Sequence, residues 1–180
     1  MSKFVKTLDI MSALKAALLA LQLPSAFAAA QDYPAAFTTV AIYGSESLLK
    51  ALEDLLVQDD RVCFIIPAGD HDTPVREGTN LSVTRISDFV LLIADRNFGR
   101  ESEALLGSTA PDDTNPGVIL LKDLVAENLT GAGLGLPYVM LAPTDGQSLH
   151  LTDKEKKEAS GRDCWALTFQ THAGRMTATK

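Results

Sequence analysis

Two apolar runs of strand length constrain the fold of this chain most strongly. The first is RVCFIIPAG at residues 61–69, and the second is FVLLIA at residues 89–94, which ends a longer segment, 81–97, with an alternating first half. A strand that is apolar on both faces is typical of a sheet interior with a layer on each side. We therefore expect 61–69 to be a central strand, and 81–97 to be a strand with one exposed end.

Three segments have the spacing of apolar residues that is typical of amphipathic helices. These segments are residues 8–23, 45–58 and 115–131. Ser45 and Asn115 are suitable N-caps for the second and third helices, and Pro116 suits a first helical position. Gly131 suits the C-terminal cap of the third helix.

The remaining apolar segments predict strands, and the polar segments between them predict loops. The strands are expected at 35–44, 136–143, 147–151 and 162–174, with loops at 70–80 and 152–160 and a flexible connection at 98–117. Because the chain ends in a run of strands, it lacks the strict alternation of a doubly wound nucleotide fold. We expect an α/β (α+β) fold in which about three helices pack on one face of a mixed, mainly antiparallel sheet of five or six strands.

The N-terminal segment allows two interpretations. Residues 15–32, KAALLALQLPSAFAAAQD, have the apolar run and small residues of a secretory signal peptide. However, Lys15 interrupts the run, and the apolar residues recur at helical spacing, so we favour an amphipathic helix over 8–23. Thr7 or Asp9 is the expected cap, and Pro24 the expected stop.

Composition limits the classes of partner. A chain of 180 residues is long enough for one domain with its own core, and we treat 1–180 as a single domain with a core at about 37–173. A net charge of −7 disfavours nucleic acid as the main partner, because phosphate binding requires a basic surface. No apolar run approaches the ~20 residues of a membrane span. Cys63 and Cys164 lie in apolar runs and are expected to be buried free thiols.

The motifs of enzymes and metal sites are weak in this sequence. GAGLGL at residues 131–136 resembles a dinucleotide fingerprint, but it follows a predicted helix and not a strand, which indicates a helix cap and a loop. Asp70, His71 and Asp72 are adjacent in a predicted loop without a second group of ligands.

The other histidines, His150 and His172, lie at separate strand positions and are expected to be structural. No nucleophile has a convincing base partner. We therefore expect no catalytic residues, no metal and no cofactor.

Charged residues gather at the two ends of the strand predicted over 81–97. They are Arg85, Asp88, Asp95, Arg96, Arg100 and Glu101. Such residues either form a solvated strand end or a subunit interface in which complementary charges set the register between neighbours. The second interpretation predicts a protein that binds copies of itself.

The order of elements resembles the tail terminator (tail completion) proteins of Mu-like phages and prophages. The resemblance covers roughly residues 8–173: the N-terminal helix, RVCFIIPAGD, the long strand that follows, the helix NPGVILLKDLVAENLTG, and the C-terminal strands. The segment at about 24–57, with its own strand and helix patterns, departs from the family.

The resemblance implies a structural protein of the virion, made in the host cytoplasm, that forms a ring of six subunits on the end of the tail tube. Its partners would be copies of itself, the tail tube protein and a neck or connector protein, with no membrane and no direct recognition of nucleic acid. The alternatives are a head–tail connector subunit, a small enzyme, and a secreted binding domain if the N-terminus is a signal peptide.

Overall fold

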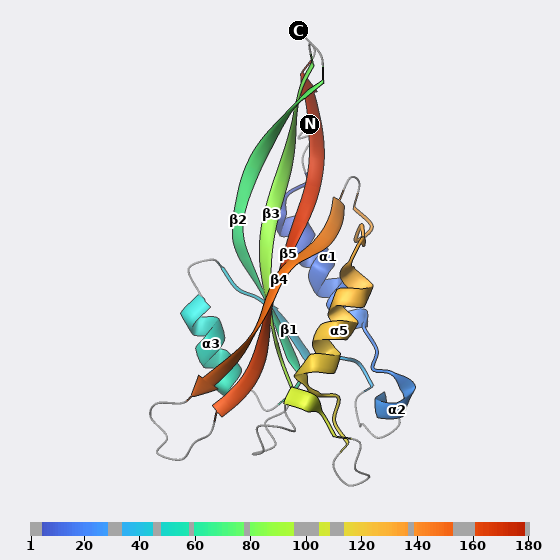
Figure 1. The fold of residues 1–180 in the computed structure, drawn as a ribbon, viewed down its shortest axis with the longest axis vertical. Coiled ribbons are helices and arrows are strands. Elements are labelled where there is room, and N and C mark those ends of the chain that lie inside the picture. The colour runs from blue at the N-terminus through green and yellow to red at the C-terminus, as the bar shows by residue number, and fades with distance from the viewer. Residues whose placement is uncertain are drawn as a thin grey trace.

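A five-stranded sheet forms the centre of the molecule (Figure 1). The computed structural model describes residues 5–28, 34–44, 48–57, 60–77, 80–95, 105–108, 114–136, 139–152 and 161–178. The strands are β1 (Thr39–Ile42), β2 (Val62–Glu77), β3 (Asn80–Ala94), β4 (Val139–Thr152) and β5 (Gly161–Ala178). Their order in space is β1-β2-β3-β5-β4; β1 is parallel to β2, and the other neighbours are antiparallel. The predicted α+β class and mixed, mainly antiparallel sheet are confirmed.

Helices cover both faces of the sheet. They are α1 (Thr7–Ala20), the short α2 (Ser25–Ala28), α3 (Leu48–Val57) and α5 (Gly117–Leu129). Because side chains alternate along a strand, Cys63 and Ile65 of β2 pack with α1 and α5, while Phe64 and Ile66 pack with α3. The expectation that all helices share one face is therefore wrong for α3, and β2 is a central strand covered on both faces, as expected.

Apolar stripes at helical spacing attach α1 and α5 to the sheet. Ile10, Leu14 and Leu18 of α1 are fully buried, as are four apolar side chains of α5: Val118, Leu121, Val125 and Leu129. The helix predicted over 8–23 is thus present, but it ends at Ala20. It is an integral part of the larger core.

The ends of the helices differ from the sequence-based expectations. Neither Thr7 nor Asp9 caps α1, because the N-cap position is Lys6 and the Thr7 hydroxyl instead donates a hydrogen bond to Asp70 Oδ2 at 3.0 Å. Asn115 does not cap α5, although Gly131 has the left-handed backbone (φ 75°) expected just beyond that helix. Ser45, the expected cap of α3, lies outside the described residues.

β2 is much longer than predicted. Residues 70–77 continue it as a strand, paired residue by residue with β3 from Asp70↔Ser87 to Glu77↔Asn80. The prediction of a loop over 70–80 is wrong because the turn-forming residues of this segment are overridden by a partner strand that offers backbone hydrogen bonds over its whole length. A bulge between Pro67 and Gly69 marks where the apolar half ends and the polar half begins.

β4 is one strand where two were expected. Residues 136–143 and 147–151 were predicted as two separate strands, whereas β4 runs through the stretch between them and pairs with β5 on both sides of it. A bulge between Pro143 and Asp145 accommodates the extra residue without ending the strand. The predicted loop at 152–160 lies almost entirely outside the described residues.

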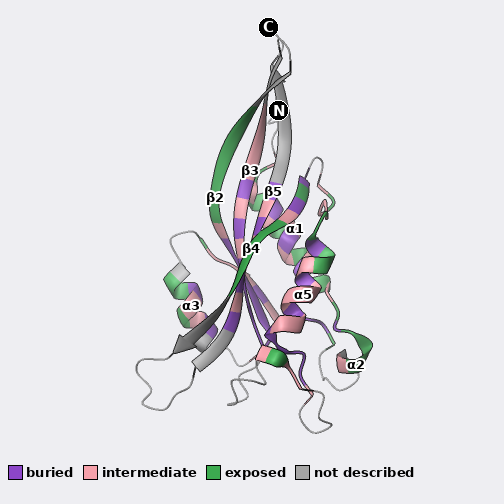
Figure 2. Cartoon of the chain, in the orientation of Figure 1, coloured by how far each residue is buried: buried purple, intermediate pink, exposed green. Residues whose placement is uncertain are grey.

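Three strands project beyond the helices as an arm, which we define as residues 70–77 of β2, 80–87 of β3 and 171–178 of β5 (Figure 1). Asp70, Ser87 and Thr171 lie side by side at its root, and Leu81 pairs with Ala178 near its tip. The β2 side chains at residues 70–74 are exposed, in contrast to the buried side chains of the same strand at 62–66 (Figure 2).

Candidate subunit interface

Polar side chains of three elements meet at the root of the arm. Asp70 accepts the hydrogen bond from Thr7 of α1, and His71 Nδ1 lies 3.6 Å from Asp88 Oδ2. Asp70 and Ser87 are cross-strand partners, as are His71 and Ile86. Because neighbouring residues on a strand point to opposite faces, Asp70 faces the α1 side of the sheet and His71 faces the α3 side.

Arg85 forms an ion pair inside the arm. Its Nε donates to Asp72 Oδ1 at 3.0 Å and its Nη2 donates to Asp72 Oδ2 at 3.4 Å, so the guanidinium binds both carboxylate oxygens. The hydrogen bonds from Arg85 lower the pKa of Asp72 from its ordinary value of 3.8. Both side chains remain partly exposed, so this pair adds a fixed charge pattern to the surface of the arm and little to its stability.

Asp88, one of the predicted interface residues, has a carboxylate oxygen without a hydrogen-bond partner among the described residues. Its Oδ2 faces His71, while its Oδ1 is buried and has no hydrogen-bond partner among the described residues. A buried carboxylate oxygen without a donor is uncommon and calls for an explanation. A donor from another molecule would satisfy it.

Asp95 has a structural role within the fold of the chain. It is only 1% exposed, and its Oδ2 accepts a hydrogen bond of 2.6 Å from the backbone N–H of Gly117. Asp95 thus fills the capping role that we predicted for Asn115 at the start of α5. The other predicted interface residues, Arg96, Arg100 and Glu101, lie outside the described residues.

The two outer strands carry features that oppose strand addition. β1 pairs with β2 only from Val62 to Ile65, and beyond Ile65 no described strand pairs with the outer edge of β2. Pro67 and Pro74 lie on this edge strand, and Pro143 lies on β4, the strand at the opposite edge. Proline lacks the N–H that a neighbouring strand needs, so these edges are poor templates for continuous pairing.

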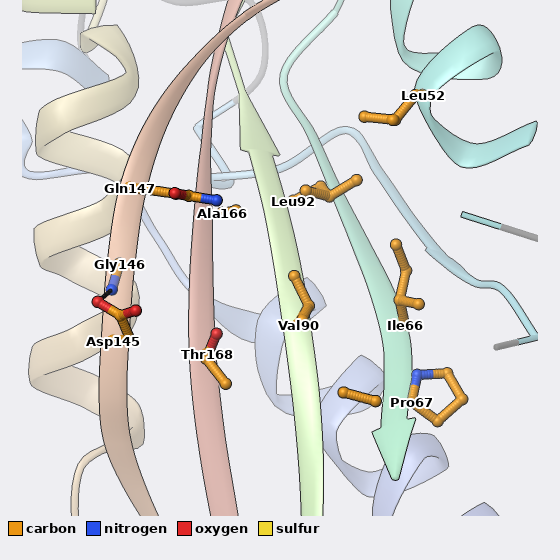
Figure 3. Close-up of a pocket in the computed structure, with 11 residues that line it drawn as sticks. Leu52, Ile66, Pro67, Val90, Leu92, Asp145, Gly146, Gln147, Ala166 and Thr168 are labelled. Carbon is orange, nitrogen blue, oxygen red and sulfur yellow. Dashed lines mark hydrogen bonds between the residues drawn. The ribbon is translucent and has the colours of Figure 1, made fainter. Parts of the chain in front are cut away.

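An apolar groove of about 360 Å³ lies on the α3 face of the sheet, next to the root of the arm (Figure 3). Ile66, Val90 and Leu92 lie along the strands that form its floor, with Leu52 of α3 on one side and β4 on the other. Asp145 contributes a carboxylate to the β4 side, where its Oδ1 accepts a hydrogen bond from the Gly146 N–H at 2.7 Å. We call this feature the groove.

Sequence-based reasoning missed the groove because its residues were assigned to separate elements. Asp145 was not assigned to any strand and Gln147 was expected at the start of another strand, yet both lie along β4 and line the groove. The pairing of β4 with β5, which continues past the bulge, brings them to the groove, with β5 between them and Val90 of β3. The alternation of apolar residues gave no signal for a strand at residues 144–146.

The segments that weakly resembled enzyme and metal motifs lie in ordinary elements of the fold. GAGLGL connects α5 to β4, with left-handed backbone at Gly131 and Gly135, so it is the helix end and loop that we expected. In the described part of the chain, no three His, Cys, Asp or Glu side chains are grouped as ligands for a metal ion. His150 and His172 belong to β4 and β5.

Neither Cys63 nor Cys164 forms a disulfide, and both thiols are buried, as expected. They lie on opposite faces of the sheet, one in the cluster under α1 and α5 and the other in the cluster under α3. Burial raises the pKa of the Cys63 thiol well above its ordinary value of 9.0, which disfavours the reactive thiolate.

Over the described residues, no helix combines the length and the apolar character that crossing a membrane requires. No model of a known protein family matches the chain, and no curated protein sequence matches it significantly.

Proposed function

We propose that this chain is a structural subunit of a phage tail: a tail terminator that forms a closed ring on the end of the tail tube, stops its growth and offers a docking surface to the head. In this proposal the protein acts through its surfaces and catalyses nothing. The ring, the tube and the neck protein are the partners that the family resemblance implies.

The arm is the observation that carries the proposal. A sheet usually buries at least one face against another layer, and short strands with two exposed faces are marginally stable in water. The arm extends past α1, α3 and α5, and its described β2 side chains are exposed. Contact with a neighbouring subunit would cover it, so the shape of the chain favours a protein that functions as an assembly.

The asymmetry of the subunit favours a ring over a two-fold dimer. The arm projects from one end of the sheet, whereas the groove is hollowed into the α3 face. A contact between two different surfaces is heterologous, and it generates a ring when the rotation between neighbours closes. Prolines on the stretch of β2 beyond β1 and on β4 oppose uncontrolled edge-to-edge association, which would otherwise produce fibres.

The order of elements supports the tail assignment. The helix α1, the pair β2 and β3, the helix α5 and the pair β4 and β5 follow one another as in the resemblance. The additional segment at about 24–57 supplies β1, which is parallel to β2, and α3, which covers the second face. The segment thus adds β1 at one edge of the sheet, and the strands that belong to the resemblance, β2, β3, β5 and β4, remain neighbours in the sheet.

A capping experiment tests the proposal. Purified protein is mixed with tail tubes polymerised from the tube protein of the same phage, and negative-stain electron microscopy records the tube ends and lengths. The expected result is a ring-shaped density on one end of each tube and an arrest of elongation. Rings that bind isolated portal or neck complexes but never tubes would reject the terminator in favour of the connector subunit.

A further inference from the structure

The outward face of α1 has a pattern that the subunit itself does not use. Leu8 and Leu19 are 61% and 40% exposed, and Ser12 is also exposed. With the half-buried Lys15, these residues recur at i, i+4, i+7 and i+11, so they lie on one side of the helix, turned away from Ile10, Leu14 and Leu18. We call Leu8, Ser12, Lys15 and Leu19 the α1 stripe: two exposed leucines, about 16 Å apart along the axis, with a cation between them.

The groove has the complementary chemistry. Its floor is apolar, with Ile66 and Leu92 almost fully buried, and Leu52 of α3 flanks it. The charged residue that lines the groove is an acid, Asp145. Asp88 lies on the same face of the sheet, two residues before Val90 on β3, and its buried Oδ1 has no hydrogen-bond partner among the described residues. An apolar floor with acidic groups beside it fits a helix that presents leucines around a lysine.

The stripe and the groove face in opposite directions within one chain. α1 packs on the face of the sheet that carries Cys63 and Ile65, whereas the groove opens on the face that carries Ile66 and Val90. A chain therefore cannot place its own stripe in its own groove. A second copy can, and that copy then presents a free groove to a third.

We propose that the α1 stripe of one copy docks in the groove of the next, with Leu8 and Leu19 against the apolar floor and Lys15 beside Asp145. The contact is heterologous, so every subunit uses both surfaces, and closure gives a ring. This inference rests on the proposed function, because both require that copies of the chain associate. It adds which surfaces associate, namely the α1 stripe and the groove. The arm root, with Asp88, lies at the border of the same contact.

A charge swap tests the contact by sedimentation velocity over a range of protein concentrations. Lys15→Asp and Asp145→Lys each place like charges together at every contact, so each variant alone should self-associate at least about tenfold more weakly than the wild type. In an equimolar mixture of the two variants, opposite charges face one another at every contact between unlike variants. The mixture should therefore recover assembly, with subunits alternating around the ring.

Two further variants separate docking from folding. Leu8→Glu changes an exposed side chain, so it should abolish assembly and leave the circular dichroism spectrum and melting temperature of the monomer unchanged. Glu127→Lys, on the exposed side of α5, makes the same change of charge as Asp145→Lys away from both surfaces and should assemble as the wild type does.

Four results would overturn the inference. One is a mixture that assembles no better than its separate components. Another is self-association of both single variants at the wild-type level. This second result includes the case in which native mass spectrometry finds a small apolar ligand bound in the groove. The third is a wild-type protein that stays monomeric at about 100 µM. The fourth, capping of tubes by Lys15→Asp protein, would reject this contact and leave the proposed tail function intact. A wild-type protein that assembles through this contact but does not bind tubes would reject the tail function and leave the contact intact.

Discussion

Asp95 illustrates how one side chain joins distant parts of the chain. Its carboxylate, at the end of β3, holds the first backbone N–H of α5, and both groups are buried. We predict that Asp95→Ala lowers the free energy of unfolding by about 1–2 kcal/mol, because a buried helix cap is lost. Asp95→Asn should cost less, since an amide oxygen also caps helices. Urea unfolding measures the change, with Glu127→Ala, an exposed position on α5, as the control.

If Asp95 instead formed only a surface contact between subunits, Asp95→Ala and Glu127→Ala would have equal effects on the unfolding of the monomer. That equality would contradict its role as a cap. The sequence could not reveal this role, because Asp95 is followed directly by Arg96 and resembles an exposed strand end, while its partner Gly117 comes much later in the chain. Only the fold brings the two together.

The ion pair in the arm gives a prediction about pH. Arg85 lowers the pKa of Asp72 in the folded chain below its unfolded value, so the stabilisation from this pair is present above the unfolded pKa and is lost as pH falls through the folded pKa. In a carbon-detected NMR titration, the Asp72 carboxyl should titrate below 3.8. Arg85→Gln should return the midpoint to that ordinary value, and an unchanged midpoint would show that the pair does not persist in solution.

At the scale of elements, α1 is part of the core. Leu14 is fully buried between α1 and the sheet, whereas Leu8 of the same helix is 61% exposed. We predict that Leu14→Ala lowers the free energy of unfolding by about 2–5 kcal/mol, the usual effect of a buried leucine replaced by alanine. The matched control Leu8→Ala should change it by less than about 0.5 kcal/mol.

The unfolding measurements on these α1 variants belong at concentrations where the protein is monomeric, so that assembly does not contribute to stability. Equal effects of the two substitutions would contradict the packing of α1. They would favour the alternative in which the N-terminal segment is a leader rather than a structural helix.

Elements with a buried face were predictable from the sequence, and elements without one were not. The stripes of α1 and α5 gave the right element type because burial of one face imposes a helical period, and the runs at 61–69 and 89–94 did so because burial of both faces makes a strand continuously apolar. In the arm half of β2 the described side chains, at residues 70–74, are all exposed and impose no such period, so the Asp, Thr and Pro residues resembled a loop. The position of α3 on the second face also required the three-dimensional pairing of β1 with β2.

At the scale of the whole molecule, the arm can be shortened without disturbing the helices. His71 and Ile86 face each other across β2 and β3, so residues 72–85 can be replaced by an Asn-Gly turn, and the chain can be ended at Ala173. We predict that this protein keeps the helical circular dichroism of the wild type but forms no rings, because the contact that we propose between the arm and a neighbouring copy is lost. If electron microscopy shows that the shortened protein forms rings, the arm is not required for ring formation.

The central claim is that this protein terminates phage tails, and the distribution of tail lengths tests it most directly. Lysates of the encoding phage or prophage are compared by electron microscopy with the gene intact and with the gene deleted. The account predicts overlong tubes without heads after deletion, and tails of normal length when the protein is supplied from a plasmid. Tails of normal length in the complete absence of the protein would contradict it.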